Sequence, residues 1–145
     1  MFHIRIRRFA SLAGTVVLLQ AACGILGPDG ERVIGSLYPD LEQGPWDPPA
    51  EVLAGSSFLV TIMTGGSNGC WEKDDTEIVR QGTVYTITPY DIRPTGERMC
   101  PNNVPVFEHV ARITAAGPGT LTLRLRGRST DGIITLEHQV TVTEN

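Results

Sequence analysis

The run from Thr120 to Arg126 alternates strictly between polar and apolar residues, and this alternation is the strongest constraint on how the chain folds. Leu121, Leu123 and Leu125 occupy every second position. Successive side chains of a β-strand point to opposite faces of a sheet, so the three leucines are expected to face a core. Their burial would contribute about 5–8 kcal/mol before the entropy cost of folding is counted. The run therefore predicts a central strand.

Shorter runs with strand-like patterns recur along the chain. Strands are predicted over residues 57–63, 77–80, 83–88, 106–114 and 133–143, with glycine-rich and proline-rich segments between them. No stretch after residue 23 that is longer than a turn carries helical periodicity. About seven short strands at a spacing of roughly 8–12 residues are typical of a β-sandwich. The sequence therefore predicts an all-β fold, an antiparallel immunoglobulin-like β-sandwich over residues 50–145.

Several segments are expected to lie outside these strands. Residues 72–77 are almost entirely polar and indicate a solvated turn, because their carboxylates lack the spacing of a calcium-binding loop. Residues 89–96 and 101–105 contain prolines and are expected to be loops, since proline removes a donor from a β-ladder. Residues 38–49, with four prolines, are expected to run irregularly over the surface.

The first 22 residues have the layout of a secretory signal peptide. A basic start is followed by an apolar run from Phe9 to Leu19 and by small residues that lead to Cys23. The apolar run is too short to span a bilayer, which takes ~20 residues. We expect residues 1–22 to be removed on export. Residues 23–49 then form a tether and proline-rich segment, with an edge strand over residues 32–37.

The end of this leader resembles the bacterial lipobox, in which small residues precede a cysteine that is lipidated and becomes the new N-terminus. Ala21, Ala22 and Cys23 fit the pattern, whereas Gln20 stands where an aliphatic residue is usual. The resemblance implies that a lipid on Cys23 anchors the exported chain in a bacterial cell envelope. Ordinary signal cleavage, which would leave a plain thiol, is the alternative.

The two remaining cysteines, Cys70 and Cys100, are predicted to form a disulfide. Export brings the chain to a compartment where disulfides persist. A bridge between them would close a loop of about 31 residues and stabilise the fold by ~3–4 kcal/mol on the chain-entropy model. A metal site is the alternative, but no cysteine or histidine stands near either residue in the sequence. We expect neither a metal nor a cofactor.

The charge of the exported chain disfavours polyanionic partners. Removal of residues 1–22 takes away three of the 12 basic residues and none of the 16 acidic ones, which changes the formal net charge from −4 to −7. Nucleic acids and anionic lipids are bound through clustered lysine and arginine. The chain has one lysine, Lys73. We therefore expect no nucleic-acid partner.

Catalytic motifs are missing from the sequence. The exported chain has two histidines, His109 and His138, and both fall in predicted strands, where His138 has the inward register. No nucleophile elbow, zinc-protease motif or phosphate-binding loop is found. We expect the protein not to be an enzyme.

A three-part pattern marks the middle of the chain. Gly69-Cys70-Trp71, then Thr88-Pro89-Tyr90-Asp91, and finally Cys100 occur in this order. In this pattern the chain resembles uncharacterised bacterial lipoprotein domains of immunoglobulin-like fold, over about residues 50–145. The resemblance implies fold and export, and no activity.

Two functions of different class are consistent with these features. The first is a membrane-anchored structural or interaction module that binds a protein or glycan of the envelope through loops or a sheet edge. Its candidate binding residues are Trp46, Trp71, Tyr90, Arg126 and Arg128. The alternative is a chagasin-like inhibitor of cysteine proteases. Residues 64–71 and 126–128 occupy the places of two of that family's loops, where Gly69 and Arg126 match.

Overall fold

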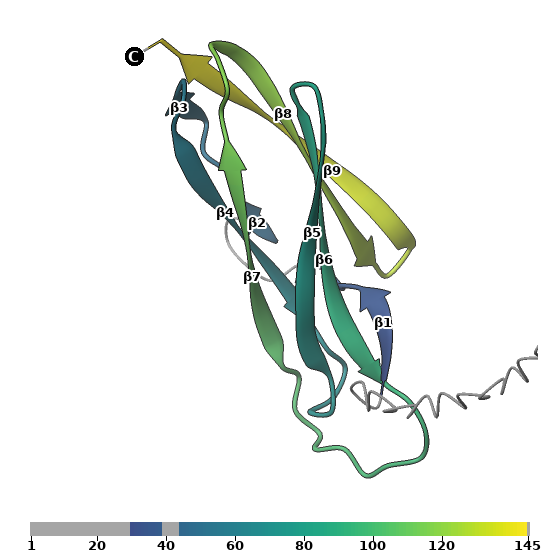
Figure 1. Cartoon of the computed structure of the whole chain (residues 1–145). Coiled ribbons are helices and arrows are strands. Elements are labelled where there is room, and N and C mark those ends of the chain that lie inside the picture. The colour runs from purple at the N-terminus through teal and green to yellow at the C-terminus, as the bar shows by residue number, and fades with distance from the viewer. Residues whose placement is uncertain (1–29, 39–43, 145) are drawn as a thin grey trace, which may run out of the picture.

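The computed structural model of the chain describes residues 30–38 and 44–144 (Figure 1). The predicted signal peptide, Cys23 and the first part of the predicted tether lie outside the described residues. Within them the chain is all-β and contains no helix, so the all-β part of the predicted fold is confirmed. The strands are β1 (Gly30–Ile34), β2 (Trp46–Asp47), β3 (Glu51–Leu53), β4 (Ser57–Gly65), β5 (Glu72–Gln81), β6 (Val84–Pro94), β7 (Val106–Thr114), β8 (Gly119–Ser129) and β9 (Gly132–Thr143).

The strands form two sheets. The larger has the order β1-β6-β8-β9-β3, with β5 on the opposite edge of β6, and the smaller has the order β2-β4-β7. Strand β6 pairs in parallel with β8, and β3 pairs in parallel with β9. The expectation of purely antiparallel sheets is therefore wrong. After β6 the chain leaves the larger sheet and forms β7 in the smaller sheet. It then returns to the larger sheet as β8, which runs in the same direction as β6.

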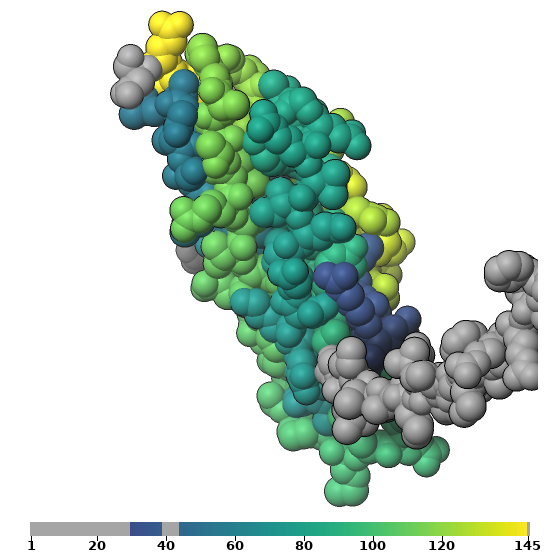
Figure 2. All heavy atoms as spheres, viewed as in Figure 1, coloured from purple at the N-terminus to yellow at the C-terminus, as the bar shows by residue number. Residues whose placement is uncertain are grey.

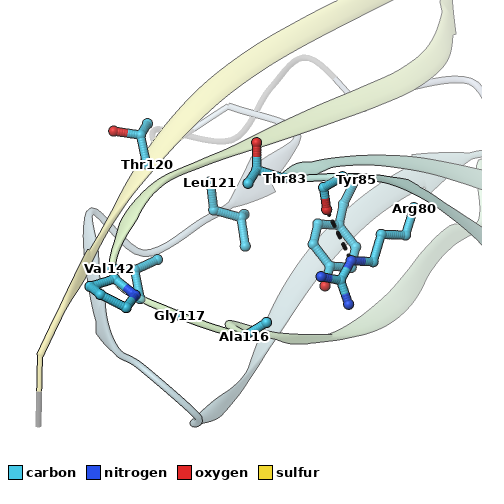
Figure 3. A pocket seen from close by; sticks show the side chains of 10 residues that line it. Arg80, Thr83, Tyr85, Ala116, Gly117, Thr120, Leu121 and Val142 are labelled. Carbon is cyan, nitrogen blue, oxygen red and sulfur yellow. Dashed lines mark hydrogen bonds between the residues drawn. The ribbon is translucent and has the colours of Figure 1, made fainter.

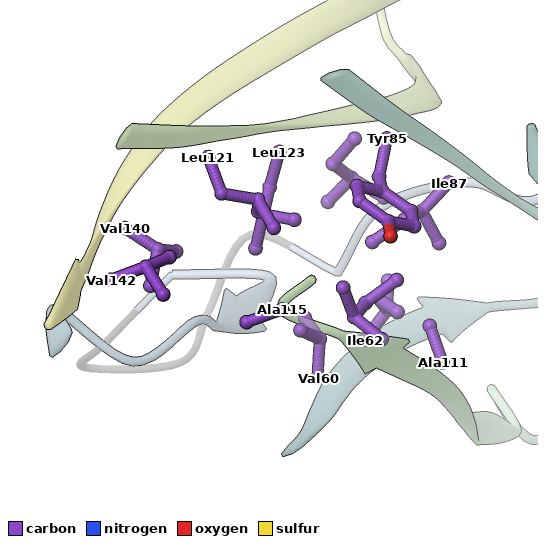
Figure 4. Packing of buried hydrophobic residues seen from close by; sticks show 12 residues of the cluster. Val60, Ile62, Tyr85, Ile87, Ala111, Ala115, Leu121, Leu123, Val140 and Val142 are labelled. Atoms are coloured by element: carbon purple, nitrogen blue, oxygen red, sulfur yellow. The ribbon is translucent and has the colours of Figure 1, made fainter. Parts of the chain in front are cut away.

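The core lies between the two sheets (Figure 4). The three leucines of β8 face it as predicted, with Leu123 and Leu125 fully buried. Strand β7 has the predicted bounds, and its His109, Ala111 and Ile113 side chains are fully buried. The smaller sheet contributes Val60, Ile62, Ala111 and Ile113, and the larger contributes Tyr85, Ile87, Leu121, Leu123, Leu125, Val140 and Val142.

Strands β5 and β6 are longer than predicted, so the solvated turn over residues 72–77 and the loop over residues 89–96 are wrong for most of their length. Strand β5 lies at a sheet edge, where charged side chains remain in solvent. Pro89 is tolerated inside β6 because its partner is Thr76, next to an irregularity of the β5 ladder between Lys73 and Thr76.

The segment that follows β1 crosses from the larger sheet to the smaller one. Gly35 N donates to the Pro89 carbonyl oxygen at 2.9 Å, and Tyr38 N donates to the Met63 carbonyl oxygen at 3.0 Å. Gly35 leaves no room for a side chain, because a Cβ would lie 2.6 Å from the Thr64 methyl carbon. The predicted edge strand 32–37 is thus β1, shifted to residues 30–34, followed by this crossing. A short strand, β2, lies in the segment that was predicted to be irregular.

Leu123→Asp is expected to abolish folding, because it places a carboxylate in the fully buried centre of the core. Leu59→Asp is the matched control, since Leu59 is 51% exposed on β4. We expect its free energy of unfolding to change by no more than ~1 kcal/mol. Circular dichroism and urea unfolding measure both. A cooperatively folded Leu123→Asp protein would contradict the placement of β8 in the core.

Candidate functional site

The structure does not bring the five candidate binding residues together. Trp46 begins β2 and packs against the core, with its ring edge-on to His138 at a centroid distance of 6.2 Å. Tyr90 lies in β6 rather than in a loop, and the Arg32 guanidinium sits 3.9 Å from its ring centroid. Both aromatic residues therefore already have partners within the fold.

Trp71 lies at the end of the molecule that carries the disulfide. The Sγ atoms of Cys70 and Cys100 are 2.15 Å apart, which confirms the predicted pairing. The Trp71 indole N–H donates to Ser67 Oγ at 3.1 Å, and its side chain packs over Gly66. In the loop that the disulfide holds, Met99 is fully exposed.

Arg126 and Arg128 lie in strand β8, not in a loop. That placement departs from the loop arrangement on which the protease-inhibitor resemblance was drawn. With Arg124 they form a row of arginines that alternates with the inward-facing leucines, so the row lies on the outer face of the larger sheet. Arg124 Nε donates to Glu137 Oε1 at 2.6 Å. Neither Arg126 nor Arg128 has an acidic partner among the described residues.

A hollow of about 300 Å³ opens beside the last arginine of this row. It is lined by Ser36 and Leu37 from the crossing segment and by Arg128, Ser129 and Thr130 at the end of β8. The Arg128 Nε atom is shielded from solvent and has no hydrogen-bond acceptor among the residues that the structure describes. We call this feature the Arg128 hollow. Sequence reasoning named Arg128 but could not find the hollow, because Ser36 and Leu37 are distant in the chain.

A second, smaller pocket lies near the turn between β5 and β6 (Figure 3). Its volume is about 110 Å³. Arg80 Nε donates to the Gly82 carbonyl oxygen at 3.0 Å, and the Tyr85 hydroxyl donates to the Thr114 carbonyl oxygen at 2.8 Å. Its arginine and its tyrosine are therefore already engaged within the protein, in contrast to Arg128.

A buried polar network joins the two sheets next to the crossing segment. His109 of β7 and Asp91 of β6 are both fully buried, and His109 Nε2 lies 3.1 Å from Asp91 Oδ1. Thr64 Oγ1 of β4 is also 3.1 Å from His109 Nε2. On the other side of the ring, Thr76 Oγ1 of β5 lies 3.0 Å from His109 Nδ1. The network thus links strands from both sheets.

An ionised carboxylate only accepts, so a hydrogen bond from His109 to Asp91 requires a proton on Nε2, whereas the Thr76 hydroxyl can either donate to Nδ1 or accept from it. Asp91 Oδ2 is buried without a partner and faces Gly35, where a Cβ would lie 2.9 Å from it. Since the pair is closed to solvent, no substrate reaches it in this conformation. We interpret it as a joint between the sheets.

Figure 2 shows the face on which β5 and β7, the strands that carry Thr76 and His109, lie side by side. The sequence placed His109 in a strand, but its partner was hidden because Asp91 was placed in a loop. His138 is half-buried in β9, with Nε2 at 3.2 Å from the Pro49 carbonyl oxygen.

Among the described residues, no group of three or more histidine, cysteine, aspartate or glutamate residues could hold a metal ion. The described part of the chain contains no helix that is long and apolar enough to cross a membrane.

Comparison of the chain with protein-family models, with curated proteins and with solved structures finds no match.

His109→Ala is expected to lower the free energy of unfolding by ~3–5 kcal/mol, because it leaves the buried Asp91 carboxylate without its partner. His138→Ala is the matched control and should cost less, since its ring is only half-buried. Adding Asp91→Asn to His109→Ala should recover at least ~1 kcal/mol by removing the uncompensated charge. Urea unfolding measures all three, and equal costs for the two histidines would contradict the joint.

Proposed function

We propose that the protein is an exported, lipid-anchored interaction module with an immunoglobulin-like β-sandwich, which binds a protein or glycan of the bacterial cell envelope. It acts by binding and not by catalysis. The leader and lipobox pattern supports export, and the Cys70–Cys100 pair fits an oxidising compartment. Two sheets with a shared core between them support the sandwich.

The start of β1 indicates how such an anchor would orient the molecule. Gly30 pairs with Pro94, the last residue of β6, just before the loop that the disulfide holds (Figure 1). Seven residues lead from Cys23 to Gly30, and a fully extended chain of that length spans at most ~25 Å. A lipid on Cys23 would therefore keep the disulfide end near the bilayer. The outer face of the larger sheet would remain accessible.

The single observation that carries the binding role is the unpartnered end of the arginine row. In a chain whose exported form carries a net charge of −7, Arg126 and Arg128 have no acidic partner, and a hollow adjoins Arg128. Arg124, the first arginine of the same row, is paired with Glu137. Groups left without a partner on a rigid strand are suited to binding one from outside.

Cys23→Ser is expected to release the exported protein from membranes, because the residue that carries the lipid is lost. Detergent partitioning of cell fractions and the mass of the mature N-terminus measure this. Ser11→Ala, a change inside the apolar run of the leader, is the matched control and should leave membrane association unchanged. Unchanged partitioning of Cys23→Ser into the detergent phase would contradict lipidation.

Binding is tested with the purified mature chain carrying Cys23→Ser and isolated envelope fragments of the producing bacterium. We expect saturable retention that unlabelled protein competes away, with urea-unfolded protein as the control. A titration against papain is the second arm. Failure of saturable retention would contradict the interaction module, and nanomolar inhibition of papain would favour the protease-inhibitor alternative.

A further inference from the structure

We propose that the Arg128 hollow binds an acidic sugar, meaning a sugar ring that carries a carboxylate or phosphate group. This inference rests on the proposed function and names the chemical class of its partner. The glycan is recognised through one charged group and one ring, and not through a long polyanionic surface.

The charged group is suggested by the guanidinium of Arg128, which lines the hollow. Its Nε atom is shielded from solvent, whereas its terminal nitrogens are accessible and have no hydrogen-bond or ion-pair partner among the described residues. Their N–H groups can therefore donate to an acceptor from outside the chain. A guanidinium presents its N–H groups as a planar fork, which matches the two oxygens of a carboxylate or phosphate. We therefore assign this acceptor to an oxyanion.

The position of Arg128 is fixed by the backbone around it. Its amide N donates to the Gly35 carbonyl oxygen at 2.9 Å, and its carbonyl oxygen accepts from Leu37 N at 2.9 Å. The crossing segment thus lies alongside β8 and holds Ser36 and Leu37 against the arginine. A site whose walls are bonded to each other in this way is ordered before any ligand arrives, which lowers the entropy cost of binding.

The other walls of the hollow suit a sugar ring. Leu37 supplies an apolar surface, and Ser36 and Thr130 supply hydroxyls that make no side-chain hydrogen bond within the described residues. The Ser129 hydroxyl is already engaged, since it accepts from Asp131 N at 3.2 Å and lies 3.4 Å from the Gly132 carbonyl oxygen. A volume of about 300 Å³ is at the lower end of the range for small-molecule sites.

The charges around the hollow favour a single acidic group. Arg126 lies two residues away on the same face of β8, roughly 7 Å along the strand, and adds a second positive charge. Asp131 in the adjoining turn makes no ion pair with Arg128. The surplus of acidic residues over the rest of the exported chain opposes a long polyanion such as a nucleic acid.

The test follows the Nε–H signal of Arg128 by two-dimensional ¹H–¹⁵N NMR on the mature chain carrying Cys23→Ser. The four probes are glucuronate, glucose 6-phosphate, glucose and inorganic phosphate. We expect at least one acidic sugar to shift the Arg128 signal saturably and to bind at least about fivefold more tightly than glucose and inorganic phosphate. The better of the two acidic sugars identifies the charged group as carboxylate or phosphate.

Two outcomes of this titration would overturn the inference. In the first, neither acidic sugar moves the Arg128 signal. In the second, inorganic phosphate binds as tightly as both sugars, which would mean that the ring plays no part. Because the titration uses the unaltered hollow, it remains decisive even where a variant fails to fold.

Arg128→Lys keeps the positive charge but removes the Nε donor and the fork, so it should weaken binding of the preferred sugar by about tenfold or more. Arg112→Lys is the matched control, because Arg112 is exposed on β7 and outside the hollow. The Arg112→Lys protein should bind the preferred sugar with unchanged affinity. Equal affinities for the two variants would refute the role of Arg128. If the Arg128→Lys protein is still retained by envelope fragments, only the acidic-sugar inference fails. If the protein with an unaltered hollow is not retained at all, the interaction module itself is refuted.

Discussion

The hydrogen-bonded pair of Asp91 and His109 determines how the two sheets can meet. The core between them is apolar over much of its length, but it ends at a region where β6 and β7 bring a carboxylate and an imidazole into full burial. An isolated charge there would be very costly, and the hydrogen bond between the two side chains offsets part of that cost. Thr64 and Thr76, one from each sheet, hold the imidazole from its two nitrogens. The joint therefore fixes the sheets in register with each other.

The same region also determines the shape of the outer surface. Gly35 lies directly above Asp91 and Thr64, and only a residue without a side chain fits there. Its carbonyl oxygen accepts from Arg128 N, so the buried joint and the Arg128 hollow are connected through one residue. A disturbance of the joint is thus expected to move a wall of the hollow. The inner polar network and the outer candidate site are consequently two sides of one backbone crossing.

Local patterns predicted the elements that have one buried face. Strand β8 and strand β7 were found because apolar residues alternate along them, and pairing of Cys70 with Cys100 followed from export and elimination. The first half of β5 was missed because its exposure at a sheet edge removes the alternation, and the second half of β6 was missed because of Pro89. Parallel pairing and the contact between Asp91 and His109 depend on where distant strands lie, which no local pattern records.

The crossing also limits where a ligand could be found. Ser36, a wall of the hollow, follows Cys23 by 13 residues, and an extended chain of that length spans at most ~45 Å. With a lipid on Cys23, the hollow could therefore reach only the part of the envelope close to the membrane surface. A partner that occupies it must expose its acidic group within that distance. Anchor and hollow together thus favour a glycan that lies next to the bilayer over one displayed far from it.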